Sequence, residues 1–168
     1  MVVSESRAMK AVITLLRVLI ILNLVAAGFF LLLLVGSYAD IVQTKIQQSG
    51  ADVSPAALLA SVRLVMTIGL LSVPFAHVLL IRLKAIVGTV QAGDPFVADN
   101  AGHLKTIAWT LLALQLLDVG FGFASAIAEE PFGWTFSLTG WLAVILLFVL
   151  ARVFDHGTRM REELAGTV

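Results

Sequence analysis

The sequence predicts an all-α integral membrane protein, a bundle of four transmembrane helices. Three observations support this prediction: the chain is 60% hydrophobic and only 13% charged, its mean hydropathy is +1.01, and its apolar residues form long runs. In soluble domains about a quarter of the residues are charged, so this chain has too few charged residues to cover a surface that faces water. The sequence contains no internal repeat and no low-complexity tract, and we therefore expect a single domain over residues 1–168.

The composition also argues against several kinds of chemistry. The chain contains no cysteine, which excludes disulfides, thiolate nucleophiles and cysteine-ligated metals. Its formal net charge is zero, so no overall field attracts nucleic acid. No phosphate-binding loop, nucleophile elbow or zinc-protease motif is present. We expect no enzymatic activity, no cofactor, no metal site and no direct binding of nucleic acid.

The first predicted span covers residues 11–35 and includes Arg17 and Asn23. About 25 residues at 1.5 Å each are long enough to cross a hydrocarbon layer of roughly 30 Å with some tilt. A cleaved signal peptide is the competing interpretation, because Ala26, Ala27 and Gly28 are small. The apolar region of a signal peptide ends after about 7–15 residues, whereas here residues 29–35 continue it, which favours a retained anchor.

The second predicted span covers residues 57–83, with Pro74 expected to kink it. In the preceding loop, over residues 36–60, the apolar spacing predicts a short interfacial helix that ends near Gly50. Ser54 and Pro55 are typical of the start of the next helix, as its cap and first residue. That helix is expected to extend beyond the membrane to about Gln91.

The remaining spans are predicted over residues 101–128 and 134–154, with the third helix starting between Ala98 and Ala101. Residues 129–133 are short and polar enough for a tight turn, and residues 155–168 form a polar, partly helical tail. Glycines within the third span, Gly120 and Gly122, are expected to permit close helix approach.

Basic residues predict the orientation. One side of the membrane would hold only Lys45 and Arg63, and the other would hold Arg7, Lys10, Arg82, Lys84, Lys105, Arg152, Arg159 and Arg161. Because loops rich in Lys and Arg stay in the cytoplasm, we expect both termini and the central link to lie there, with the protein in the inner membrane.

Five polar residues fall inside the predicted spans: Asn23, Arg63, His77, Gln115 and Asp118. Asn23 and Asp118 both lie about 20 Å from the inner level, so a hydrogen bond between the first and third spans is possible. The long side chain of Arg63 could also reach down towards Asp118. Gln115 and Asp118 share one helix face. Asp118 is either the centre of a proton or ligand site or part of a polar clasp that fixes helix register, and the clasp is favoured.

The central link over residues 84–100, the elbow, has the features of a rigid turn between helices. Gly93 can adopt positive φ and end the preceding helix. Pro95 cannot continue that helix and biases Asp94 away from it. Phe96 is expected to fold back between helix ends as an apolar anchor, and Asn100 to bond exposed backbone groups at the next helix start. A simple structural link between two hairpins is the alternative to a functional role.

The elbow and tail carry a family resemblance. The residues concerned are Val90-Gln91-Ala92-Gly93-Asp94-Pro95-Phe96, Asn100, Leu104, Ile107 and Trp109, then Val153-Phe154, Gly157, Met160-Arg161-Glu162-Glu163-Leu164 and Gly166-Thr167-Val168. With these motifs the sequence resembles the bacterial membrane proteins of Domain of Unknown Function 2975. The resemblance implies a four-helix membrane protein with no established activity. It also implies that a small helix-turn-helix transcription regulator is often encoded beside it.

The leading functional hypothesis is a membrane-anchored interaction or regulatory protein. Its docking surface would comprise elbow residues Gly93, Asp94, Pro95, Phe96 and Asn100 and tail residues Arg159, Arg161, Glu162 and Glu163. The resemblance makes a small DNA-binding regulator the favoured partner beside the lipid bilayer, and a homo-oligomer is also compatible. One alternative is a small transporter or channel component that uses Asp118. Another is a structural or immunity-type membrane protein that depends on the loop over residues 36–60.

Overall fold

The structure, a computed structural model, describes residues 2–48, 54–127 and 134–165. In these ranges the chain forms the helices α1 (Val2–Gly36), α2 (Asp40–Gln48), α3 (Pro55–Gln91), α4 (Ala98–Ile127) and α5 (Leu138–Ala165). All but α2 are long and apolar enough to cross a membrane. The predicted all-α class with four membrane-spanning helices is therefore confirmed.

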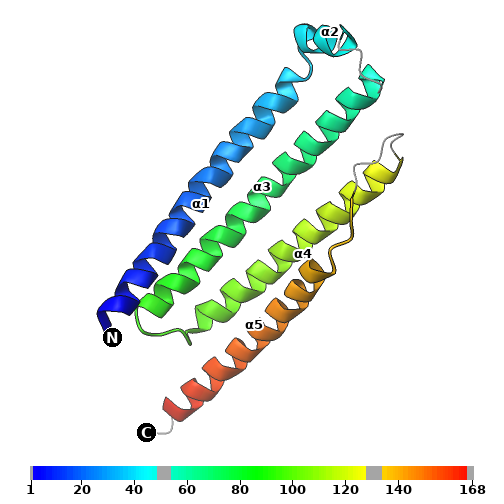
Figure 1. Cartoon of the computed structure of the whole chain (residues 1–168). Coiled ribbons are helices and arrows are strands. Elements are labelled where there is room, and N and C mark those ends of the chain that lie inside the picture. The colour runs from blue at the N-terminus through cyan, green and yellow to red at the C-terminus, as the bar shows by residue number, and fades with distance from the viewer. Residues whose placement is uncertain (1, 49–53, 128–133, 166–168) are drawn as a thin grey trace.

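The four long helices pack in chain order, each against the next (Figure 1). Helix α1 packs on α3, α3 on α4, and α4 on α5, whereas α1 has no comparable packing with α4 or α5 in the described ranges. Figure 1 shows the start of α1, the elbow and the end of α5 at one end of the molecule, which we call the elbow end. The short helix α2 lies at the opposite end. Which end faces the cytoplasm stays a prediction.

The best-buried side chains lie on the first half of α4. Ala101, Leu104 and Ala108 recur at helical spacing on one face, and Ile107 is buried beside them. Small alanines let the neighbouring helices approach this face closely. Large apolar side chains elsewhere, such as Leu32 and Phe123, point outward. This distribution fits a hydrocarbon solvent, in which exposed apolar surface carries no penalty.

The start of α3 follows the sequence prediction. The Ser54 hydroxyl accepts a hydrogen bond from the Ala57 backbone N–H at 3.1 Å, and Pro55 occupies the first turn. The helix continues through Pro74 and ends at Gln91, as predicted. Helix α2 is the short helix expected in the first loop, although its predicted end near Gly50 falls outside the described residues, as does the predicted turn over residues 129–133.

The last helix starts later than predicted. Residues 134–137 were expected to open the fourth span, but they are not helical and α5 begins at Leu138. The Ser137 hydroxyl accepts a hydrogen bond from the Gly140 backbone N–H at 3.4 Å. A hydroxyl residue in this position caps a helix, because it satisfies an N–H that has no partner in the first turn. The cap therefore sets the start of α5 at a point that the apolar run alone does not mark.

Glycines allow side chains of neighbouring segments to lie directly on the helix backbone. A Cβ atom at Gly122 would come within 2.5 Å of the Trp134 ring, and one at Gly69 within 2.9 Å of the Phe30 ring. The Gln115 side chain occupies the corresponding space at Gly140. At Gly122 the close neighbour is the Trp134 ring of the non-helical segment before α5, so the expected close helix approach is not what this glycine permits, and at Gly120 no atom lies within 4 Å of an added Cβ.

These two glycines form a matched pair for a stability test. We expect Gly122→Ala to destabilise the protein by about 1–3 kcal/mol, because the added methyl group must displace a large aromatic ring. Gly120→Ala should be neutral or stabilise by up to about 1 kcal/mol, because alanine favours the helix and meets open space. Thermal unfolding in detergent, followed by circular dichroism, measures both, and equal melting temperatures would contradict the packing of Trp134 on Gly122.

Candidate functional site

The first half of the elbow is a glycine-terminated helix end. Gly93 has a φ of 88°, in the region that residues with a Cβ atom rarely adopt. The Gly93 N–H donates to the Val90 carbonyl at 3.1 Å, and the Asp94 N–H donates to the Thr89 carbonyl at 3.1 Å. This pair of bonds defines a Schellman motif, which satisfies the last carbonyls of α3 and turns the chain sharply. The predicted role of Gly93 is confirmed.

Asn100 connects the two sides of the elbow. Its side-chain amide donates to the Thr89 hydroxyl of α3 at 2.6 Å and to the Pro95 carbonyl at 2.7 Å. Thr89 in turn donates to the Ile86 carbonyl at 2.8 Å. Asn100 is 0% exposed, so these hydrogen bonds form away from water, where an unpaired polar group is costly.

The position of Asn100 changes its predicted role. The sequence predicts that it caps the start of the next helix and forms part of the docking surface. Because the side chain is fully buried, it cannot touch a partner and instead holds the elbow in shape. Thr89, its partner on α3, cannot be predicted from the sequence, since an isolated threonine near a helix end has no distinctive signal.

Phe96 packs against α5, not between the ends of α3 and α4. Its ring stacks on Phe154 with centroids 5.2 Å apart and an interplanar angle of 26°. The Phe96 ring also lies beside Gly157, where an added Cβ atom would meet it at 3.8 Å, an ordinary van der Waals distance. Phe96 nevertheless remains 48% exposed. The predicted apolar anchor is present, and the helix that it anchors is α5.

An ion pair fixes the same two segments. The Arg161 guanidinium donates to the Asp94 carboxylate and, more weakly, to the Phe96 carbonyl at 3.5 Å. The Arg161 side chain is 59% exposed and the Asp94 side chain 42% exposed, so water screens the pair and it contributes little free energy. We call Asp94 and Phe96 of the elbow, with Phe154, Gly157 and Arg161 of α5, the elbow–tail clasp.

The other predicted tail residues are arranged differently. Arg159 pairs with Asp155 at 3.2 Å, one turn earlier on α5, and takes no part in the clasp. Glu163 is exposed, and the side chain of Glu162 falls outside the described residues. The structure thus brings Arg161 to Asp94 and Phe96, which precede it by 67 and 65 residues in the sequence.

The predicted contacts of Asp118 are not formed. Asn23 donates to the Val73 carbonyl of α3 at 3.2 Å, because α1 packs on α3 and not on α4. Arg63 donates to the Ser37 hydroxyl at 3.2 Å and the Ser37 carbonyl at 2.9 Å, and its guanidinium lies 3.9 Å from the centroid of the Tyr38 ring. Arg63 therefore points to the end of α1, where it satisfies a terminal carbonyl.

The remaining intramembrane polar residues do not form one site with Asp118. Gln115 lies against Gly140 of α5, and His77 has a buried Nδ1 without a hydrogen bond. Asp118 is half-buried and makes no hydrogen bond or ion pair within the described ranges. Whether Asp118 binds a ligand or holds the helices together stays a prediction. Across residues 2–48, 54–127 and 134–165, no three His, Asp or Glu residues gather as a metal site.

Fold and site together define a multi-pass membrane protein with four candidate spans and a structured elbow at one end. A family model described as "Protein of unknown function (DUF2975)" matches residues 43–168. The match covers most of the chain, including the whole clasp, and the chain belongs to this family. Neither curated proteins nor solved structures give a significant match.

The buried amide of Asn100 makes a specific prediction. Asn100→Asp keeps the shape of the side chain but replaces its only donor group with an acceptor, which leaves the Pro95 carbonyl unpaired. We expect a loss of about 1–3 kcal/mol in the free energy of unfolding, measured by chemical denaturation in detergent. The control is the reverse exchange at the exposed neighbouring residue. Asp99→Asn should lower the free energy of unfolding by less than about 1 kcal/mol. Similar losses in both variants would show that the amide network contributes little.

Proposed function

We propose that this protein is a membrane-anchored docking protein whose partner binds the elbow end. The observation that supports the proposal is the elbow–tail clasp, which joins the link between α3 and α4 to the polar last turns of α5. A surface made of two segments that are already fixed to each other loses little conformational entropy when a partner binds. This pre-organisation is what a docking surface needs and what a simple flexible link would lack.

The chemistry of the exposed side chains supports the same proposal. Phe96 is 48% exposed and Met160 is 52% exposed, next to the charged residues Arg159 and Arg161. Aromatic residues, methionine and arginine are enriched in protein–protein interfaces, where they often contribute most of the binding energy. Arg161 is fixed by Asp94, so its apolar stem and guanidinium are presented in one orientation.

The partner that we propose is a small DNA-binding regulator in the cytoplasm. This choice is based on the family resemblance, which links such membrane proteins with helix-turn-helix regulators. We further propose that the protein lies in the bacterial inner membrane with both termini in the cytoplasm. Arg82 and Lys84 lie near the end of α3 that leads into the elbow, and Lys105 and Arg152 line the cleft at the same end, which supports this orientation, since cytoplasmic loops are enriched in basic residues.

Charge reversal of the clasp tests the docking proposal. We expect Asp94→Arg and Arg161→Asp each to reduce the capture of a DNA-binding regulator at least tenfold, because each breaks the ion pair and places two like charges together. The double variant restores an ion pair of opposite direction and should recover part of the binding. The measurement is in-cell cross-linking, mild-detergent purification and quantitative mass spectrometry of the proteins that come along.

Asp99→Arg is the matched control, because it reverses an exposed charge near the start of α4 outside the clasp. Membrane insertion is checked by fractionation for every variant. If the unaltered protein captures no DNA-binding regulator, or if both single variants capture it as well as the control does, the elbow–tail clasp is not a docking site. Loss of the protein from the membrane in both single variants would make the clasp purely structural and would also refute the proposal.

A further inference from the structure

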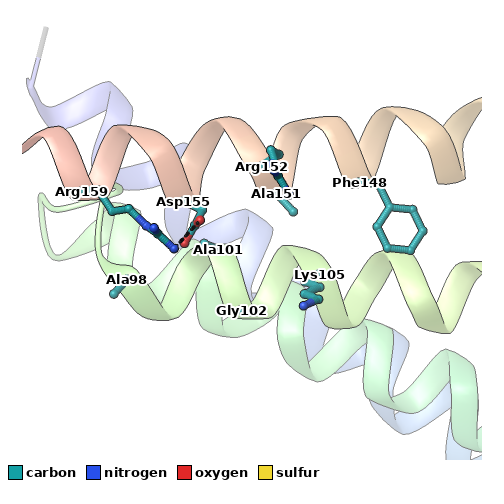
Figure 2. A pocket seen from close by; sticks show the side chains of 9 residues that line it. All are labelled: Ala98, Ala101, Gly102, Lys105, Phe148, Ala151, Arg152, Asp155 and Arg159. Atoms are coloured by element: carbon teal, nitrogen blue, oxygen red, sulfur yellow. Dashed lines mark ion pairs between the residues drawn. The ribbon is translucent and has the colours of Figure 1, made fainter.

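A cleft of about 500 Å³ opens between α4 and α5 at the elbow end (Figure 2). Small residues create the space: Ala98, Ala101 and Gly102 on α4, and Ala151 on α5. A Cβ atom added at Gly102 would meet no atom within 4 Å, so this wall of the cleft is open. Sites for small ligands typically have volumes of about 300–1,000 Å³, and this cleft falls in that range.

The charged residues of the cleft are mainly basic. Lys105 comes from α4, and Arg152 and Arg159 come from α5. The single carboxylate in the lining is Asp155, which is paired with Arg159 at 3.2 Å (Figure 2). Within the described part of the chain, Lys105 and Arg152 form no hydrogen bond or ion pair. Two positive charges on opposite walls are therefore uncompensated, and the cleft favours an anion.

Phe148 lines the inner side of the cleft and packs against Trp109, which lies beside the cleft. Trp109 follows Lys105 by four residues on α4, and Phe148 precedes Arg152 by four residues on α5, so each ring lies one turn deeper than a cation on the same helix face. The two rings meet edge to face with centroids 5.2 Å apart. Trp109 remains 56% exposed and continues the apolar surface. The cleft is thus basic at the elbow end and apolar towards the middle of the spans.

We propose that this cleft binds the headgroup of an anionic phospholipid. The phosphate lies between Lys105 and Arg152, where the guanidinium can donate two parallel hydrogen bonds, and an acyl chain runs along Trp109 and Phe148. Basic pockets between transmembrane helices are suited to such headgroups. Inorganic phosphate offers the same anion, but it would leave the apolar part of the cleft unused. The inference does not depend on the docking proposal, because Lys105 and Arg152 take no part in the elbow–tail clasp.

The test compares phosphatidylglycerol with phosphatidylcholine. The purified protein is titrated with each lipid in neutral detergent, and bound lipid is counted by native mass spectrometry. We expect phosphatidylglycerol to bind more tightly, and Lys105→Gln with Arg152→Gln to weaken it about 30-fold, the effect of two basic groups near a membrane surface. The control is Arg82→Gln with Lys84→Gln, which removes two charges from α3 outside the cleft and should change the affinity less than threefold.

A second variant separates the cleft from charge alone. Gly102→Leu fills the open wall without altering any charge, and it should weaken phosphatidylglycerol binding to a similar extent. If the double variant Lys105→Gln with Arg152→Gln does not fold, Gly102→Leu alone tests whether phosphatidylglycerol binds in the cleft. Equal binding of the two lipids, or equal losses in the cleft variant and the α3 control, would overturn the proposal. The proposal would also be overturned if inorganic phosphate displaced phosphatidylglycerol at equal concentration, because the site would then recognise free phosphate. Regulator capture is measured separately, so failure here is distinguishable from failure of docking.

Discussion

The arrangement of the elbow depends on the buried amide of Asn100. Its two hydrogen bonds join the last turns of α3 to the loop that leads into α4, and the Schellman turn at Gly93 makes this short connection possible. In this arrangement Asp94 and Phe96 project towards α5, where Arg161 and Phe154 meet them. One fully buried side chain thereby supports a surface that is itself partly exposed.

A lipid solvent explains why the rest of the fold can be so open. The helices pack in a row, each on its neighbour in sequence, and most large apolar side chains face outward. In water such an arrangement would expose far too much apolar surface, but in a bilayer the hydrophobic effect does not drive helix association. Close packing at glycines and alanines and local hydrogen bonds hold the row together instead, as at Gly122, Ala108 and Asn23.

Two of the polar side chains inside the spans, Asn23 and Arg63, form hydrogen bonds with the neighbouring helix. Arg63 bonds to the end of α1, and Asn23 bonds to a backbone carbonyl of α3, although their depths in the membrane had suggested contacts with Asp118. Depth along the membrane normal restricts which residues can meet, but the order of helices around the bundle decides which do. Since α1 and α4 are not packed on each other, equal depth of Asn23 and Asp118 has no consequence.

The sequence by itself determined the class of protein, the number of spans, the ends of α3 and the glycine turn of the elbow. These features follow from local properties, namely long apolar runs, caps and the conformational freedom of Gly93, and they can be predicted without knowing which segments pack against them.

The tertiary structure decided the contacts between segments that are distant in sequence. The stacking of Phe96 on Phe154, the burial of Asn100 and the basic cleft between Lys105 and Arg152 all require two helices in a particular rotation about their axes. Helices that are apolar on nearly every side carry little information on that rotation, so only their packing reveals it.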